Sequence, residues 1–248
     1  MTKLIFSYGF LKSGSTLAFH YITALLEDAG HPQPLLPPDM LGARRRINYV
    51  DDVGTDQLHS LWQEVQRSGH PRVLKTHQRP GPAVLPLLRD GRAEAHACWR
   101  DPRDMALSLL DHGARARARG QDPFAEIATL AHALQSILGQ VETFEAWRGA
   151  GALPLAYEDI AFDPEPVLDA IAAHHALPRG PVDVDALKRS RFTQFNRGIP
   201  HRHRTEMDPA DAARIAAACP VWMTAQRAPL APPARSDKRP EIKRGTAP

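Results

Sequence analysis

The stretch Ser7–Leu26 reads SYGFLKSGSTLAFHYITALL and decides the fold of this chain. It continues an apolar run that predicts a strand over residues 3–8, buried on both faces, and it enters a second apolar pattern that predicts a helix over 15–29. The turn between them holds a lysine, a glycine and three hydroxyl residues. A strand–turn–helix junction presents free backbone N–H groups and the positive end of a helix dipole, so the stretch predicts an anion cradle.

The residue types of this turn favour phosphate as the anion. Gly14 lets the backbone approach closely, Ser13, Ser15 and Thr16 carry hydroxyl donors, and Lys12 adds a positive charge. The nucleoside-triphosphate loop has its lysine after its last glycine, whereas Lys12 precedes Gly14 by two residues. The turn therefore differs from that motif. Taken alone, it also fits an ordinary capped helix with an exposed lysine.

The rest of the chain alternates short apolar runs with amphipathic stretches. Strands are expected at 72–76, at 93–99 and at GALPLAYEDI (151–160). Helices are expected at 55–68, 82–90, 101–113, 123–148, 163–177 and 208–218. In this pattern Gly113 closes a helix, and His174 and His175 lie at the surface. The alternation predicts a three-layer α/β/α fold with a central, mostly parallel sheet.

Composition is that of one soluble globular domain. The chain has 248 residues, 43% of them hydrophobic, and a net charge of +3. Cys98 and Cys219 lack CxxC partners, which favours a reduced, cytoplasmic setting. We expect no signal peptide, no membrane span and no nucleic-acid partner, and the oligomeric state stays open. Residues 1–227 are expected to form one domain, and the Pro-, Lys- and Arg-rich tail 228–248 to be poorly ordered.

Two further polar clusters follow predicted strands. Lys75 and His77, in LKTH, are two residues apart and so project from the same face of a strand. Arg100 and Ser108 are eight residues apart at the next strand end, where an arginine fork and a hydroxyl can grip one phosphate. Ligands gather at the carboxyl ends of parallel strands, so the three clusters are expected to meet. Singly, each of these two also fits a solvated surface.

Together the motifs resemble the PAPS-dependent sulfotransferase family, whose donor is 3′-phosphoadenosine 5′-phosphosulfate. The similar segments are YGFLKSGST (8–16), LKTH (74–77), WRDPRDMALS (99–108), LAYEDIAFDP (155–164) and FNRGIPHRHRTEM (195–207), in the family's order. The resemblance implies a P-loop-like sulfotransferase architecture. Three positions depart from the family pattern: Leu11 replaces a proline, Leu17 stands where many members have a tryptophan, and Asn196 leaves only one basic residue in the late loop.

The resemblance also implies roles for individual residues. Lys12 would neutralise the leaving phosphate, His77 would take the acceptor proton, and Lys75 would assist the sulfuryl oxygens or the leaving group. The remaining donor contacts would be Ser13, Gly14, Ser15 and Thr16 to the 5′-phosphate, Arg100, Ser108, Arg197 and Gly198 to the 3′-phosphate, and Tyr157 near the adenine. The product would be adenosine 3′,5′-bisphosphate (PAP), and no metal is required.

The acceptor is expected to be a small molecule with a hydroxyl or an amine. Its pocket would come from the variable segments, at about 31–54, 78–92, 111–124 and 199–206. The Ala-, Arg- and Pro-rich composition is typical of a GC-rich bacterial source, in which secondary metabolites are common acceptors for this family.

Two other functions stay open. One is an ATP-dependent small-molecule kinase on a related fold. The other is a non-enzymatic polyanion-binding module that uses the basic runs 43–46, 114–120 and 201–204, although these lack interleaved aromatic residues. His201 and His203 could form a metal pair, but their spacing supplies no third ligand. Glu158 and Asp159 are expected to hold loop backbone.

Overall fold

A four-stranded parallel sheet forms the centre of the fold. The computed structural model describes residues 2–121, 124–189 and 199–219. The strands are β1 (Leu4–Gly9), β2 (Arg72–Thr76), β3 (Ala93–Trp99) and β4 (Leu153–Ala156), in the order β2-β1-β3-β4. Ser7 of β1 is in register with Lys75 of β2 and with His96 of β3. All four strands therefore end at the same edge of the sheet, as the sequence predicted.

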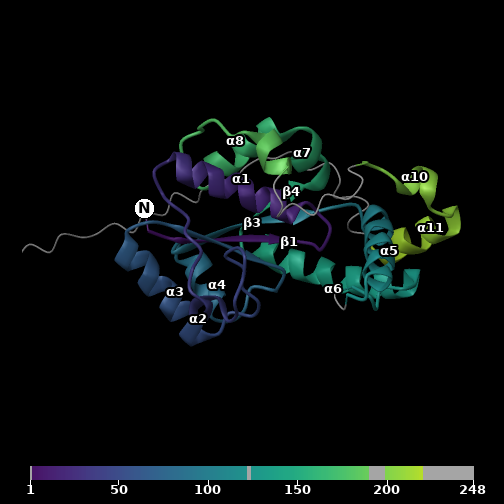
Figure 1. The fold of residues 1–248 in the computed structure, drawn as a ribbon, viewed down its shortest axis with the longest axis horizontal. Helices are drawn as coiled ribbons and strands as arrows, with labels where there is room; N and C mark the ends of the chain where they lie inside the picture. Colours follow the sequence, from purple (N-terminus) through teal and green to yellow (C-terminus); the bar gives the residue numbers. More distant parts are fainter. Residues whose placement is uncertain (1, 122–123, 190–198, 220–248) are drawn as a thin grey trace, which may run out of the picture.

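Helices cover both faces of the sheet (Figure 1). On one face, Ile5 of β1 packs in a core built from α1 (Ser15–Asp28), α7 (Tyr157–Phe162) and α8 (Pro164–His174). On the other, Phe6 and Tyr8 pack in a core with α3 (Thr55–Ser68), α4 (Val84–Arg89) and α6 (Leu130–Gly149). Successive strand residues point to opposite faces, so the mostly apolar β1 contributes side chains to both cores. The predicted three-layer α/β/α architecture is confirmed.

Three helices gather at one end of the molecule, beyond the carboxyl edge of β3. The long helix α5 (Pro102–Ala118) leaves β3, and α10 (His203–Glu206) and α11 (Pro209–Ala218) lie against it (Figure 1). Asp101 caps α5, because its side chain accepts a hydrogen bond from the Arg103 backbone N–H. This end of the molecule therefore carries the Arg100–Ser108 motif on a capped, packed helix.

The long segment 31–54 is attached to the sheet rather than lying apart from it. It contains the short helix α2 (Pro38–Leu41), and its Tyr49 forms an isolated parallel bridge with Lys75. The Lys75 backbone N–H donates to Asn48 O at 2.7 Å, and the Val50 N–H donates to Lys75 O at 2.9 Å. The segment thus borders β2 near its carboxyl end. The short helix α9 (Val184–Arg189) has no buried residue.

Three predicted boundaries were wrong. Helix α5 continues past Gly113, where an added Cβ would lie 2.2 Å from Ile127 O, so this glycine makes room for a neighbouring turn and does not end the helix. Helix α6 begins at Leu130, because Thr129 caps it, and not at residue 123. The fourth strand ends at Ala156, and α7 follows at once.

The surface placement of His174 and His175 was also wrong for one of the pair. His175 is fully buried, with Nδ1 2.9 Å from Glu94 Oε2 and Nε2 3.3 Å from His96 Nδ1, whereas His174 is half-buried. The predicted contacts Arg197 and Gly198 and the tail 228–248 lie outside the described residues. Among the described residues, no helix is long and apolar enough to cross a membrane.

Candidate active site

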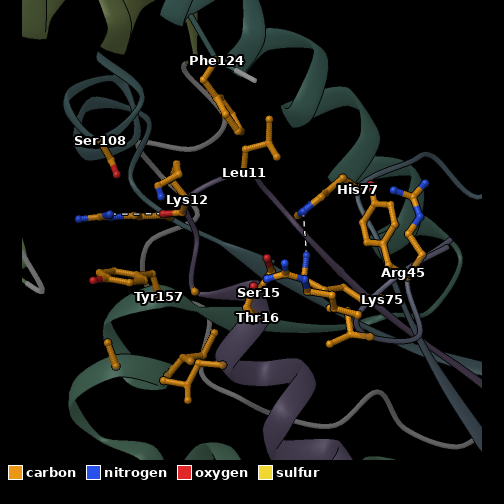
Figure 2. A pocket seen from close by; sticks show the side chains of 18 of the residues that line it. Leu11, Lys12, Ser15, Thr16, Arg45, Lys75, His77, Ser108, Phe124 and Tyr157 are labelled. Carbon is orange, nitrogen blue, oxygen red and sulfur yellow. Dashed lines mark hydrogen bonds between the residues drawn. The ribbon is translucent and has the colours of Figure 1, made fainter. Parts of the chain in front are cut away.

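A cavity of about 600 Å³ opens where the carboxyl ends of the strands meet (Figure 2). It is lined by residues of all three polar clusters and of the 31–54 segment: Leu11, Lys12, Gly14, Ser15, Thr16, Leu17, Arg45, Arg46, Ile47, Tyr49, Asp51, Lys75, His77, Arg100, Ser108, Phe124, Tyr157, Ile160 and Ala161. The structure therefore brings the separately predicted clusters together in one site. A cavity of this size accommodates a nucleotide-sized ligand.

The β1–α1 turn forms one wall of the cavity. Lys12 and Gly14 both adopt left-handed backbone conformations, with φ of 70° and 75°. Gly14 also faces the Tyr157 ring, 3.1 Å from the position of an added Cβ, so any larger residue there would press on this ring. Ser15 and Thr16 begin α1 and line the cavity. The turn thus directs the start of α1 at the cavity, as the anion-cradle prediction requires.

Ser13 is placed differently from its neighbours. Its side chain is fully buried, and Oγ donates to Phe10 O at 2.8 Å. Its backbone N–H also donates to Phe10 O, at 3.3 Å. Ser13 therefore shapes the turn from within and does not line the cavity.

Lys12 reaches into the cavity near other cations. Burial, together with the positive charges of Arg115 and Arg100, lowers the pKa of Lys12 to about 8. Such a positive environment favours an anionic ligand, which would restore the charged form of the lysine. The end of α5 adds Arg115 to a field that already contains Lys12, Lys75 and Arg100.

Lys75 and His77 form a close pair on the neighbouring strand end (Figure 2). Lys75 Nζ lies 2.7 Å from His77 Nε2, and His77 Nδ1 lies 2.6 Å from Gly9 O. A carbonyl can only accept, so His77 carries its proton on Nδ1 and holds Nε2 as an acceptor. Burial, with the charge of Lys75, lowers the pKa of His77 to about 3, and burial lowers the pKa of Lys75 to about 7. The histidine is neutral and has one basic nitrogen facing the lysine.

Arg100 is held on three sides. Its Nη1 donates to Lys12 O at 3.3 Å, its Nη2 donates to Ile199 O at 3.4 Å, and its guanidinium lies 3.9 Å from the Tyr157 ring centroid. The stacked ring fixes the plane of the guanidinium, as in a cation–π pair. Ser108 lies two turns along α5 on the same side of the cavity (Figure 2).

The opposite wall comes from residues that the sequence placed only in variable segments or, for Arg45, in the basic run 43–46. The Tyr49 ring centroid lies 4.9 Å from Arg45 Cζ and 5.7 Å from the centroid of the His77 ring. Arg45 also forms an ion pair with Asp51. Phe124 closes the cavity on the α5 side (Figure 2). These residues belong to segments predicted to form an acceptor pocket. Their individual contributions could not be predicted, because loop residues carry no periodic pattern.

No family model and no curated protein matches the sequence. Solved structures do match the fold, and two of them are complexes with PAP. The crystal structure of mouse sulfotransferase SULT7A1 complexed with PAP is 14% identical with a TM-score of 0.56, over 93% of this chain and 87% of that chain. Retinol dehydratase in complex with androsterone and inactive cofactor PAP is 16% identical with a TM-score of 0.52, over 91% and 82%. The chain has the PAPS-dependent sulfotransferase fold.

Proposed function

We propose that this protein transfers a sulfuryl group from 3′-phosphoadenosine 5′-phosphosulfate to a hydroxyl or amine of a small-molecule acceptor. The observation that carries the proposal is the single cavity in which Lys12, the Lys75–His77 pair and Arg100 face one another. Solved proteins of the same fold hold PAP, which supports this donor. The cationic lining fits a donor with several negative charges.

In this proposal the donor lies between α1 and α5. Gly14, Ser15 and Thr16 hold the 5′-phosphate with Lys12 beside the bridging oxygen. Arg100 and Ser108 hold the 3′-phosphate, and the Tyr157 ring lies near the adenine. The predicted 3′-phosphate contacts Arg197 and Gly198 remain part of the proposal. Ser13 contributes through the shape of the turn, because its hydroxyl is already bonded to Phe10 O.

The reaction is an in-line transfer. The bond between sulfur and the bridging oxygen breaks, a bond from sulfur to the acceptor oxygen or nitrogen forms, and the leaving phosphate takes the electron pair. Lys12 neutralises the charge that develops on this phosphate, and His77 Nε2 accepts the acceptor proton. In the present structure Lys75 Nζ donates a hydrogen bond to His77 Nε2. Donor binding therefore has to draw Lys75 to the sulfuryl oxygens, which frees His77.

The acceptor lies against the 31–54 segment and Phe124. Tyr49 and Phe124 provide apolar ring faces, and Arg46 is exposed at the rim of the cavity. An acceptor with an apolar body and an anionic group fits this lining. Retinol dehydratase, of the same fold, was solved with androsterone, which supports a small apolar body. A cytoplasmic role in bacterial secondary metabolism remains part of this proposal.

Mass spectrometry of acceptor panels tests the proposed function. Phenols, alcohols and amines, each with and without a carboxylate, are incubated with the donor and no added Mg²⁺. We expect a sulfated product and PAP in equal amounts. Phosphoryl transfer from ATP that depends on Mg²⁺ would instead establish the kinase. If the protein transfers neither group but binds polyanions, the non-enzymatic binding module would be established.

A further inference from the structure

A second group of polar side chains lies beside Arg100. It consists of Asp104 on α5, Glu158 on α7 and His201 in the turn before α10. One ligand atom from each residue lies within 4.8 Å of the others. The three residues are far apart in sequence, and folding brings them together by placing α10 beside α5 (Figure 1). The spacing of His201 and His203 in the sequence could not show that Asp104 and Glu158 lie near His201.

The strongest observation concerns Asp104, whose side chain is fully buried. Its Oδ1 accepts hydrogen bonds from the His203 backbone N–H at 2.9 Å and from His203 Nδ1 at 2.8 Å. Its Oδ2 has no hydrogen-bond partner among the described residues. Buried carboxylate oxygens are almost always hydrogen-bonded or metal-bound, so this oxygen requires an explanation.

Glu158 repeats the observation on the other side of the cluster. Its Oε1 is buried and also lacks a hydrogen-bond partner within the described part of the chain. Burial raises the pKa of Glu158. The earlier expectation that Glu158 holds loop backbone leaves this buried oxygen unexplained. The cluster thus contains one imidazole and two carboxylates, each with one buried oxygen that lacks a hydrogen bond among the described residues.

Arg100 is the nearest cation, and it does not satisfy these oxygens. Its Nη2 lies 3.8 Å from Asp104 Oδ2, which is too long for a hydrogen bond. Its Nη1 and Nη2 donate to Lys12 O and Ile199 O, and its plane is fixed over the Tyr157 ring; its Nε has no hydrogen-bond partner among the described residues. Asp104 Oδ2 therefore remains available to a further ligand.

We propose that Asp104, Glu158 and His201 bind one divalent transition-metal ion. Two carboxylate oxygens and one imidazole nitrogen are a donor set that suits Zn²⁺ and its neighbours, whereas Mg²⁺ prefers oxygen ligands and water. The His203–Asp104 hydrogen bonds supply the outer support that orients a ligating carboxylate. Metal–ligand bonds of about 2.0–2.2 Å would draw the three atoms closer together.

This site goes beyond the proposed sulfuryl transfer and takes no part in it. The ion would join the 199–203 turn to α5 and α7, which carry Arg100 and Tyr157. The expected effect is greater stability of this end of the molecule. It also revises the expectation that the protein has no metal site.

Calorimetry and thermal melting of the tag-free protein, without any nucleotide, test the site. We expect one Zn²⁺ per chain and a raised Tm, with little response to Mg²⁺. His201→Asn removes an exposed ligand, and asparagine tolerates the left-handed backbone at φ 54°. This variant should weaken Zn²⁺ binding at least about tenfold. His59→Asn, at an exposed position on α3, is the matched control and should bind Zn²⁺ like the wild type.

Two results would overturn the proposal. One is no Zn²⁺ binding by the wild type, which would mean that the three side chains hold no metal ion. The other is equal Zn²⁺ affinity in the wild type and His201→Asn, which would mean that other histidines bind the ion. Because no donor or acceptor is present, either result leaves the proposed sulfuryl transfer to its own test.

Discussion

Lys12 occupies a left-handed conformation in the β1–α1 turn and reaches the cavity from there. We predict that Lys12→Ala lowers kcat by on the order of 10²–10³-fold, the scale for losing one group that stabilises a transition state. Alanine has the same backbone restriction as lysine, so the turn should keep its shape. Steady-state kinetics with thermal melting checks both points. A kcat close to that of the wild type would remove Lys12 from the mechanism.

Arg100, which follows β3, and Arg103, in the first turn of α5, provide a matched comparison. Arg100 lines the cavity, whereas Arg103 pairs with Asp101 through Nη2 and Oδ2 at 2.6 Å. We predict that Arg100→Ala weakens PAP binding at least about tenfold, because a charge-assisted phosphate contact is lost. Arg103→Ala should leave the affinity unchanged. Calorimetry with PAP measures both, and equal affinities in the two variants would contradict the placement of the 3′-phosphate.

At the scale of single residues, the sequence predicted the pairs that follow from local geometry. Lys75 and His77 alternate along one strand, so their common direction could be read from spacing. The inward position of Ser13 could not, because it depends on Phe10 O within a turn of unusual backbone. The contact between Asp104 and His203 joins residues far apart in sequence and has no local signal.

Helices α5 and α6 each contain a glycine, and the two glycines have different surroundings. An added Cβ at Gly113 would lie 2.2 Å from Ile127 O and 2.8 Å from Phe124 O, whereas at Gly139 nothing lies within 4 Å. We predict that Gly113→Ala destabilises the protein by about 1–3 kcal/mol through overpacking. Gly139→Ala should stabilise it by up to about 1 kcal/mol, since alanine is the better helix former. Denaturant unfolding measures both. A stabilising Gly113→Ala would show that the 124–127 turn does not rest on α5.

At the scale of elements, the presence of a strand or helix was easier to predict than the residues at which it begins and ends. The apolar patterns located all four strands and the helices that cover the sheet. The end of α5 was missed, because Gly113 is a packing glycine and the contact that explains it comes from residues 124–127. The start of α6 was missed, because the helix begins only at the Thr129 cap. The start of α7 was missed because Tyr157 continues the apolar pattern of β4, so the sequence does not mark the point at which the strand ends and the helix begins.

A buried polar chain crosses the molecule under α8. Lys3 and His175 both contact Glu94, His175 contacts His96, and His96 Nε2 lies 2.8 Å from Ser7 Oγ. Burial lowers the pKa of His175 to about 4, and it also lowers that of His96. Burial raises the pKa of Glu94, but hydrogen bonds from His175 and Lys3 outweigh it and bring the value to about 2.

These pKa values predict how stability depends on pH. Below about pH 6.5, the ordinary pKa of histidine, His175 is protonated in the unfolded chain but stays neutral in the folded protein. The free energy of unfolding should therefore fall between about pH 6.5 and pH 4. The loss from His175 is on the order of 3 kcal/mol. The contribution of Glu94 is lost only at lower pH, below about 4.5.

Urea unfolding at a series of pH values measures this dependence. His175→Gln should be less stable at pH 7 but show a flatter pH dependence between 6.5 and 4. The exposed His59→Gln should keep the slope of the wild type. If His175→Gln keeps this slope as well, the buried chain is not its source.

At the scale of the whole molecule, parallel strand topology is what brought the predicted clusters together. The donor side of the cavity follows from strand ends and could be predicted. The acceptor side depends on how the 31–54 segment lies along β2, through Asn48 O and the Tyr49–Lys75 bridge, and no pattern in the sequence specifies that contact.

Selective binding of PAP by the wild-type protein tests the central claim most directly. Thermal melting and calorimetry compare PAP with AMP and with ATP plus Mg²⁺. At 100 times its Kd, a ligand that binds only the folded state adds about 2.7 kcal/mol of stability. We predict that PAP stabilises the protein at concentrations at which AMP and ATP with Mg²⁺ do not, because only PAP places phosphates at both Lys12 and Arg100. Preference for ATP with Mg²⁺, or no response to PAP, would contradict the proposed function.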